Sequence, residues 1–169
     1  MQIRALDTLE DVRTLEGMLA DYIHFVCDDL KADAGVTFDA AVLTANTLNG
    51  LHKVVPPLGR TFVAEAGGVR LGMVFLRPSG PEAMEIKRLY VLPEARGTGA
   101  GRALLDAAVA AAKAAGARAL RLDTARSLRP ALALYGSMGF AFRDPYPESD
   151  HFEDPVLGPY LVFMEKPLG

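Results

Sequence analysis

The chain is poor in the residues that most directly mark disulfide, metal or nucleic-acid chemistry. It has one cysteine, Cys27, so it can form neither an internal disulfide nor a thiolate metal cluster. Its three histidines, His24, His52 and His151, share no metal-ligand spacing, and we expect no metal site. The 18 Lys and Arg against 21 Asp and Glu give a net charge of −3 without a basic cluster, which argues against a nucleic-acid surface.

Long hydrophobic runs are also missing. No uncharged apolar run reaches the ~20 residues needed to span a bilayer, and residues 1–7 lack a charged-then-apolar secretory pattern. These absences predict a cytoplasmic protein with no membrane partner and no nucleic-acid partner. Because the chain has 169 residues, of which 50% are hydrophobic, it can bury one substantial core, and we predict a single domain over residues 1–169.

The spacing of apolar residues and turn residues predicts an α/β order. Helices are predicted behind a cap at Asp7, over about residues 12–30, and then over residues 39–48, 100–115 and 129–137. Strands are predicted over residues 3–6, 61–66, 69–77, 83–92, 119–124, 140–143 and 160–166. The strand-helix-strand order predicts that the strands at 83–92 and 119–124 are parallel.

The most informative segment is the glycine-rich turn at residues 97–101, which lies between a strand and an alanine-rich helix. Glycines let backbone N–H groups face inward, and the next helix adds free N–H groups and a dipole, so the turn should bind a phosphate or pyrophosphate. A P-loop is excluded because Arg102-Ala103 stands where Lys-Ser or Lys-Thr is needed. A dinucleotide fingerprint, with Asp123 as its acidic residue, is disfavoured because residues 93–96 separate the strand from the turn.

Two motifs resemble those of the GNAT superfamily of acyl-CoA-dependent N-acyltransferases. The turn fits the family pattern Gln/Arg-x-x-Gly-x-Gly/Ala through Arg96, Gly99 and Gly101. Residues 131–140 resemble the family's helix that carries a tyrosine and ends in Gly-Phe. The resemblance is close over residues 83–142. It implies the GNAT fold, an α/β domain whose central mixed, mostly antiparallel sheet is splayed at a parallel strand pair and flanked by helices on both faces.

The resemblance also implies an activity. The expected enzyme is an N-acetyltransferase that moves an acetyl group from acetyl-CoA to a primary amine of a small molecule, by direct transfer through a tetrahedral intermediate. A peptide N-terminal or protein lysine acetyltransferase is the enzymatic alternative, and a non-catalytic acyl-CoA-binding sensor is the alternative from another class. A homodimer is compatible with the family.

The family pattern further implies which residues hold acetyl-CoA. In the family the pantetheine arm pairs with the backbone of the strand before the turn, and the turn binds the pyrophosphate. The predicted set is Leu89, Tyr90, Val91, Arg96, Gly97, Thr98, Gly99, Ala100, Gly101, Arg102 and Ser127. Ser127 stands near the position where many members carry an asparagine that contacts pantetheine, but it also suits the N-cap of the following helix.

Direct transfer requires a base for the ammonium, donors for the oxyanion and an acid for the departing sulfur. Tyr135 aligns with the family tyrosine that is read as the general acid. Glu85 is the first candidate base, because related members often place a carboxylate on this strand, and simple alternation puts it on one face with Lys87 and Leu89. Asp123, at the end of the next parallel strand, is the second candidate, and a water relay from either carboxylate is a further alternative.

The loop at residues 144–159 is rich in acidic side chains. It lies between the last two strands, where family members often cover the acceptor. Two interpretations are open, an acidic lid that attracts a cationic amine and a solvated loop whose charge maintains solubility. By family analogy alone, residues 20–31 and 54–60 are expected to supply the other wall.

Overall fold

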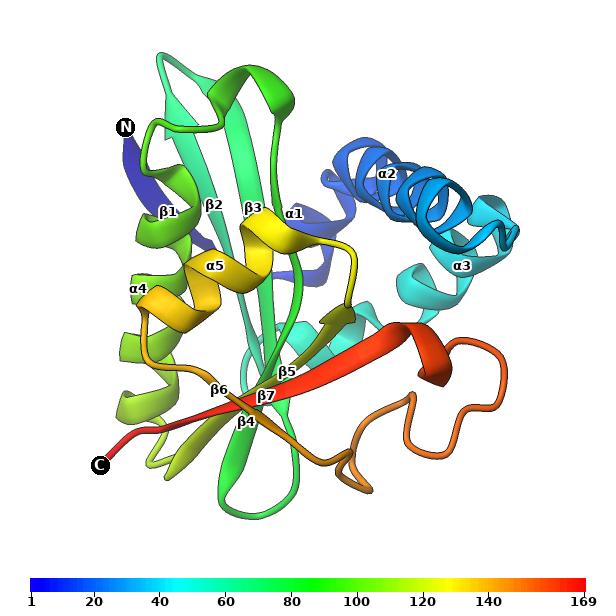
Figure 1. Ribbon diagram of the computed structural model, residues 1–169. Helices are drawn as coiled ribbons and strands as arrows, with labels where there is room; N and C mark the ends of the chain where they lie inside the picture. The colour runs from blue at the N-terminus through cyan, green and yellow to red at the C-terminus, as the bar shows by residue number, and fades with distance from the viewer.

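The computed structural model describes all 169 residues and contains a seven-stranded sheet in the order β1-β2-β3-β4-β5-β7-β6 (Figure 1). The strands are β1 (Gln2–Leu6), β2 (Arg60–Ala66), β3 (Val69–Pro78), β4 (Ala83–Val91), β5 (Ala119–Ala125), β6 (Ala141–Arg143) and β7 (Leu161–Pro167). The helices are α1 (Leu9–Arg13), α2 (Glu16–Ala34), α3 (Ala40–Asn49), α4 (Ala100–Ala114) and α5 (Arg129–Ser137). Three 3-10 turns complete the chain, at η1 (Leu51–Val54), η2 (Pro93–Ala95) and η3 (Gly158–Tyr160).

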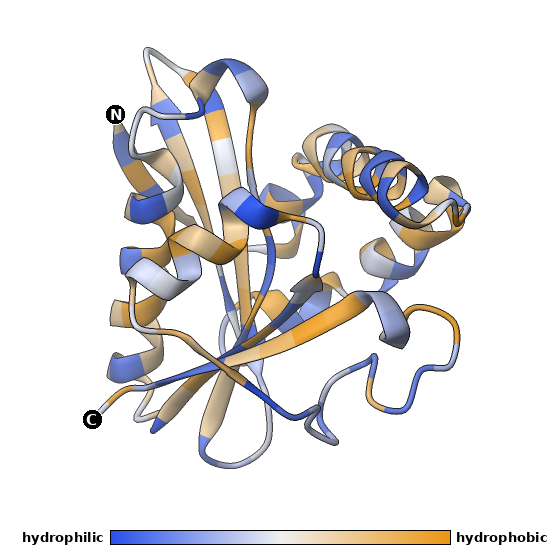
Figure 2. Ribbon diagram, viewed as in Figure 1, coloured by the Kyte–Doolittle hydropathy of each residue, from blue (hydrophilic) through white to orange (hydrophobic).

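Strands β4 and β5 are parallel, and every other neighbouring pair in the sheet is antiparallel. Helices α4 and α5 cover one face of the sheet, whereas α1 and α2 pack on the other (Figure 1). Around α2, polar and apolar residues alternate, as expected for a helix with one buried side (Figure 2). The predicted mixed sheet with helices on both faces is confirmed. None of the helices combines the length and the hydrophobicity that a membrane crossing requires.

The sheet splits between its two parallel strands. Strands β4 and β5 pair only over four positions, from Ala83 opposite Ala119 to Ile86 opposite Leu122. Beyond this point β4 continues along β3, and β5 continues along β7. The edge of β4 at residues 89–91 that faces β5 therefore has no strand partner, and its backbone N–H and C=O groups remain available.

A β-bulge in β4 reverses the side-chain alternation that the sequence predicted. One residue of β3 lies opposite two residues of β4, Arg88 and Leu89, and Arg88 has a left-handed φ of 55°. Leu89 consequently packs with the α4 core, while Glu85 and Lys87 lie on the opposite face. The prediction that all three share one face is wrong for Leu89.

The first predicted helix is divided in two. Helix α1 ends at Arg13 and α2 begins at Glu16, because the chain turns at Thr14-Leu15. The cap of α1 is Thr8 rather than Asp7, since the Thr8 hydroxyl accepts a hydrogen bond from the N–H of Asp11. The other predicted helices lie within two residues of their observed bounds.

Candidate active site

A cavity of about 470 Å³ opens where β4 and β5 diverge. Its walls are the free edge of β4 at residues 89–91, the glycine turn, the start of α4, and α5, with Tyr22 and Phe25 of α2 at one side. All of the predicted acetyl-CoA residues line it except Thr98 and Ser127. The structure thus brings most of the predicted cofactor set into one cavity.

The glycine turn presents donors to this cavity. Gly97 and Gly99 have φ values of 77° and 88°, which L-residues with a Cβ rarely adopt. The N–H groups of Gly97, Thr98 and Gly99 donate no hydrogen bond within the protein, and Gly99 is the N-cap of α4. Free N–H groups at a helix N-terminus bind phosphate oxygens, so the turn fits the pyrophosphate of acetyl-CoA.

Other residues of the turn fix its shape and charge. The hydroxyl of Thr98 donates to the carbonyl oxygen of Ala95 at 2.6 Å, so Thr98 supports the turn from behind. A Cβ at Gly101 would lie 3.2 Å from Cδ2 of Leu134, which explains a glycine where α4 and α5 approach. The guanidinium of Arg96 lies over the ring of Phe25 at 4.8 Å and adds a positive charge to the cavity wall.

Ser127 does not cap α5, and its hydroxyl bonds to another helix. Its hydroxyl donates to the carboxylate of Asp29 on α2. Helix α5 begins after Leu128 and has no side-chain cap, so the cap interpretation is wrong. Ser127 does not line the cavity, and its contact with Asp29 joins the segment before α5 to α2; its contact to the pantetheine arm stays a prediction.

Tyr135, the predicted general acid, lies in the wall of this cavity. It projects from α5, lines the cavity, and packs its ring against the edge of Phe140 with centroids 5.7 Å apart. Its hydroxyl forms no hydrogen bond within the protein and is free for a ligand. Burial raises the pKa of the Tyr135 phenol, and Tyr22 and Asp123 raise it further, so the group remains protonated and can donate.

Glu85 occupies a different environment from the one predicted for a base. Its side chain is 0% exposed, and it lines neither this cavity nor the smaller one described below. One carboxylate oxygen accepts from the Tyr146 hydroxyl at 2.7 Å and lies 3.3 Å from Nζ of Lys87. The other pairs with the Arg77 guanidinium at 2.7 Å. This geometry supports an anchoring role in the sheet and not proton transfer.

We expect Glu85→Gln to lower stability rather than chemistry. The amide loses the charge that Arg77 and Lys87 face, and one NH₂ points at a cation, so the free energy of unfolding should fall by about 2 kcal/mol. Urea unfolding of wild type and variant measures the loss. The Kd for acetyl-CoA should stay within about threefold of wild type, because Glu85 does not line the cavity. A variant of unchanged stability with a large loss of turnover would restore Glu85 as the base.

A second, smaller cavity of about 90 Å³ adjoins the first, and the two share Tyr22 and Thr124 in their walls. Apolar side chains of α2 form much of it. Its polar wall comes from three elements and consists of Lys87, Arg88, Asp123 and His151. Residues 20–31 thus supply a wall as expected, whereas residues 54–60 line neither cavity.

Asp123 lies in the wall of this second cavity as a stable carboxylate. It accepts hydrogen bonds from Nζ of Lys87 at 2.9 Å and from the Ser149 hydroxyl at 2.7 Å. Burial pushes the pKa of Asp123 up, but Lys87, His151 and Ser149 together lower it below its usual range. A carboxylate held this firmly in its charged form is a weak proton acceptor, so its position fits an electrostatic role better than that of the base.

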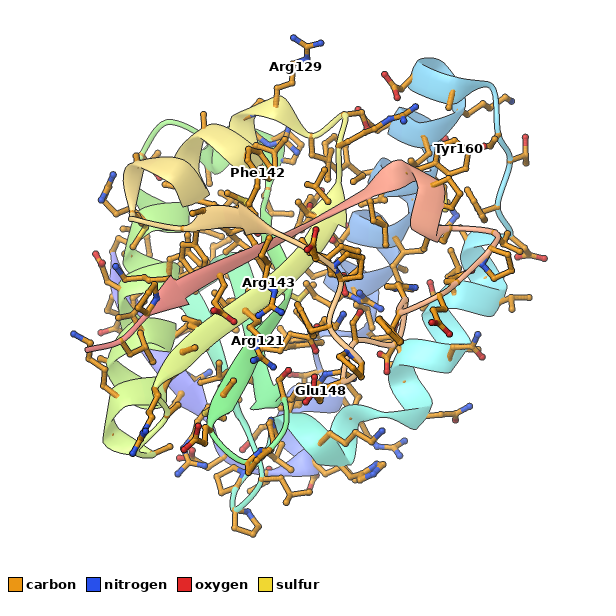
Figure 3. The ribbon with its side chains drawn as sticks, turned by 60° about the horizontal axis from the view of Figure 1, so that its bottom comes forward. Arg121, Arg129, Phe142, Arg143, Glu148 and Tyr160 are labelled. Carbon is orange, nitrogen blue, oxygen red and sulfur yellow. The ribbon has the colours of Figure 1, made fainter.

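The acidic loop at residues 144–159 is held against the sheet by hydrogen bonds and ion pairs, and we call it the pinned loop. Neither the acidic-lid interpretation nor the solvated-loop interpretation predicted these contacts. Tyr146 is 1% exposed, and the guanidinium groups of Arg121 and Arg143 lie 5.1 Å and 5.2 Å from the centre of its ring. Figure 3 shows Arg121, Arg143 and Glu148 gathered beside the crossing strands, and Arg121 lies 3.4 Å from Glu148. Asp150 pairs with Arg77 at 2.9 Å. The two acidic residues Glu148 and Asp150 are therefore neutralised by this chain.

His151 is the functional candidate that the sequence did not single out. The pinned loop carries it into the wall of the second cavity, near Asp123. Its Nδ1 lies 3.2 Å from a carboxylate oxygen of Asp154, whose pKa is lowered chiefly by the hydrogen bond from the Leu157 N–H. Only the fold brings His151 to this wall, so no local pattern predicted it.

Comparisons with known proteins agree with this geometry. The model of the Acetyltransferase (GNAT) family matches residues 24–140. An uncharacterized N-acetyltransferase of Schizosaccharomyces pombe is 37% identical over 118 residues, which cover 69% of this chain and 68% of the relative. The IAA acetyltransferase of Azospirillum brasilense is 34% identical over 155 residues, which cover 90% of this chain and 95% of the relative.

Among solved structures, the PaiA N-acetyltransferase of Thermoplasma acidophilum in complex with coenzyme A superposes with a TM-score of 0.69. It is 21% identical, and the match covers 99% of both chains, so it shows the shared fold. The splayed parallel pair, the glycine turn and these relatives lead to one assignment. The predicted resemblance is confirmed, and the chain belongs to the GNAT family of acetyltransferases.

Proposed function

We propose that this enzyme transfers the acetyl group of acetyl-CoA to the primary amine of a small molecule. The observation that carries the proposal is that two cavities meet at Tyr22 and Thr124. One presents free backbone N–H groups that can bind a phosphate, and the other is lined by ionisable side chains. The acceptor side is only about 90 Å³ and is walled by α2 and the pinned loop, which favours a small amine over a protein chain.

The residues of this chain fit acetyl-CoA as the acyl donor. The N–H groups of the turn would hold its pyrophosphate, and the free edge of β4 at residues 89–91 would pair with its pantetheine arm. When bound, acetyl-CoA supplies the thioester carbonyl that the amine attacks. The hydroxyl of Tyr135 donates a proton toward the sulfur position, because the phenol is buried, neutral and free of other partners.

His151 is the group that we propose takes the proton of the acceptor ammonium. When Nδ1 donates to Asp154, the other ring nitrogen is left as an acceptor at the cavity wall. A neutral imidazole nitrogen can accept the ammonium proton. Asp123 remains charged nearby and stabilises the imidazolium that forms.

The test of the proposed function is titration with acetyl-CoA followed by an amine screen. Isothermal titration of the purified protein should give micromolar binding of acetyl-CoA. Release of free coenzyme A thiol, measured over a panel of small primary amines and lysine-containing peptides, should be stimulated by small amines. Stimulation by peptides alone would favour the peptide or protein alternative. Binding without turnover on any amine would favour a sensor, and a folded protein that binds no acetyl-CoA would overturn both.

We expect His151→Gln to lower kcat about 100-fold at pH 7, because Gln cannot accept the ammonium proton. The loss should shrink at pH 9 to 10, where a larger fraction of the amine is already neutral. His24→Gln is the matched control, since His24 is exposed on α2 and bonds only the carbonyl oxygen of Ala20. Wild-type kcat in His151→Gln at pH 7 would assign the base elsewhere.

A further inference from the structure

Arg88 lines the second cavity, the proposed acceptor cavity, and its hydrogen bonding is incomplete. Its Nε is shielded from solvent and has no hydrogen-bond partner. The side chain makes one hydrogen bond, from Nη2 to the hydroxyl of Thr47 at 3.0 Å, and no ion pair. A buried guanidinium nitrogen without an acceptor is costly, so a ligand that supplies an oxygen there would be favoured.

Arg88 is the cation of this wall that has no carboxylate partner of its own. Lys87 lies 2.9 Å from Asp123 and 3.3 Å from Glu85, so its charge is matched within the protein. The other carboxylates near this wall are also engaged, Asp150 by Arg77 and Asp154 by His151. No carboxylate of the chain comes within 4.0 Å of Arg88, so a ligand carboxylate could pair with its guanidinium directly.

The backbone holds Arg88 at this position by the bulge in β4. Its φ of 55° is strained for a residue with a long side chain, and the bulge breaks the alternation that regular pleating would impose. Strained residues that persist are frequent at functional sites. The remaining wall is aliphatic, with Val26, Leu30 and Leu43 among its residues.

We propose that the acceptor of this enzyme is an α-amino acid with a small aliphatic side chain, whose carboxylate pairs with the guanidinium of Arg88. This inference rests on the proposed function and names its substrate class. The amine would face the shared wall at Tyr22 and Thr124, and the side chain would enter the aliphatic pocket. In the reaction the N–C bond forms and the C–S bond breaks. His151 takes one proton from the ammonium, Tyr135 protonates the departing thiolate, and the second proton lost by the nitrogen returns to the Tyr135 phenolate.

A carboxylate fits this site better than a phosphate does. The cavity is about 90 Å³, and Asp123 in the same wall disfavours a dianion. The planar donors of the Arg88 guanidinium match the two oxygens of a carboxylate.

The test compares L-valine, L-valinamide and isobutylamine as acceptors, with thiol release as the readout. We expect the wild-type kcat/KM to be roughly 30- to 100-fold higher for L-valine than for L-valinamide. Arg88→Asn should lose that preference, so that the ratio of kcat/KM for L-valine to that for L-valinamide falls to about one; Asn tolerates the left-handed backbone of this position. Arg88→Lys should recover only part of the preference, since it restores the charge without Nε.

The outcomes separate this inference from the proposed function. If L-valinamide and isobutylamine are acetylated as well as L-valine, acetyl transfer stands and the carboxylate site is wrong. If no amine is acetylated, a direct measurement still tests the site. Titration with isovalerate in the presence of coenzyme A should shift the Arg88 Nε–H resonance in the NMR spectrum of the wild type, and the absence of a shift would overturn the inference.

Discussion

Replacing Tyr135 by phenylalanine is expected to lower kcat about 10²- to 10³-fold while the Kd for acetyl-CoA changes less than about threefold. The hydroxyl lies in the cavity wall without a protein partner, so the substitution leaves no buried group unsatisfied and the ring still packs on Phe140. Burial raises the pKa of Tyr135 above its ordinary value, and we expect no alkaline loss of kcat from this group up to pH 9. Stopped-flow or steady-state thiol release measures kcat, and isothermal titration measures Kd.

The matched control for this variant is Tyr160→Phe, because Tyr160 lies near the start of β7 and lines neither cavity. It should keep both kcat and Kd. Equal losses of kcat in both variants would indicate a general effect on the fold, and an unchanged kcat in Tyr135→Phe would remove Tyr135 from the chemistry.

Gly99→Glu should weaken acetyl-CoA binding at least about 100-fold, because it places a carboxylate where the turn presents N–H groups to a pyrophosphate. Like charges held together cost several kcal/mol, and about 2.7 kcal/mol already corresponds to 100-fold. A Cβ at Gly99 meets no atom within 4 Å, so the strain is limited to the left-handed φ of 88°. Isothermal titration with acetyl-CoA gives the effect directly.

Gly116→Glu offers a control with the same strain and the same added charge. Gly116 has a φ of 79° and open space around its Cβ position, and it follows the opposite end of α4. We expect it to reduce stability about as much as Gly99→Glu does while its Kd for acetyl-CoA stays near that of wild type. If both variants bind acetyl-CoA with equal affinity, the turn is not the anion site.

The grouping of the predicted cofactor residues around one cavity was predictable from the sequence, because the determinants of the glycine turn and of α5 are local. The turn needs positive φ at positions 97 and 99, and glycine is the residue that adopts it readily. Tyr135 lies on a short helix, and the apolar spacing and Pro130 indicate where this helix begins and ends. The strand-helix-strand order already implies that β4 and β5 are parallel. The edge of β4 is open because this pairing ends at Ile86.

The acceptor side was not predictable in the same way, because contacts between distant segments build it. The hydroxyl of Tyr146 reaches Glu85 across 61 positions of sequence, and this contact turns a candidate base into an anchor. The same loop delivers His151 to the cavity. No glycine or proline marks the bulge at Arg88. The prediction therefore assumed that side chains alternate regularly through this position, and it assigned Leu89 to the wrong face of the sheet.

The bulge divides β4 into two half-strands that are out of phase with each other. Residues before Arg88 direct their odd-numbered side chains away from α4, and residues after it direct their odd-numbered side chains toward α4. Substitutions at Lys87 or Arg88 can therefore alter the acceptor wall without changing which atoms the half-strand at 89–91 offers to the donor. Under the proposed function, the residues that select the acceptor and those that hold the donor lie in separate halves of one strand, so acceptor specificity can change without moving the thioester.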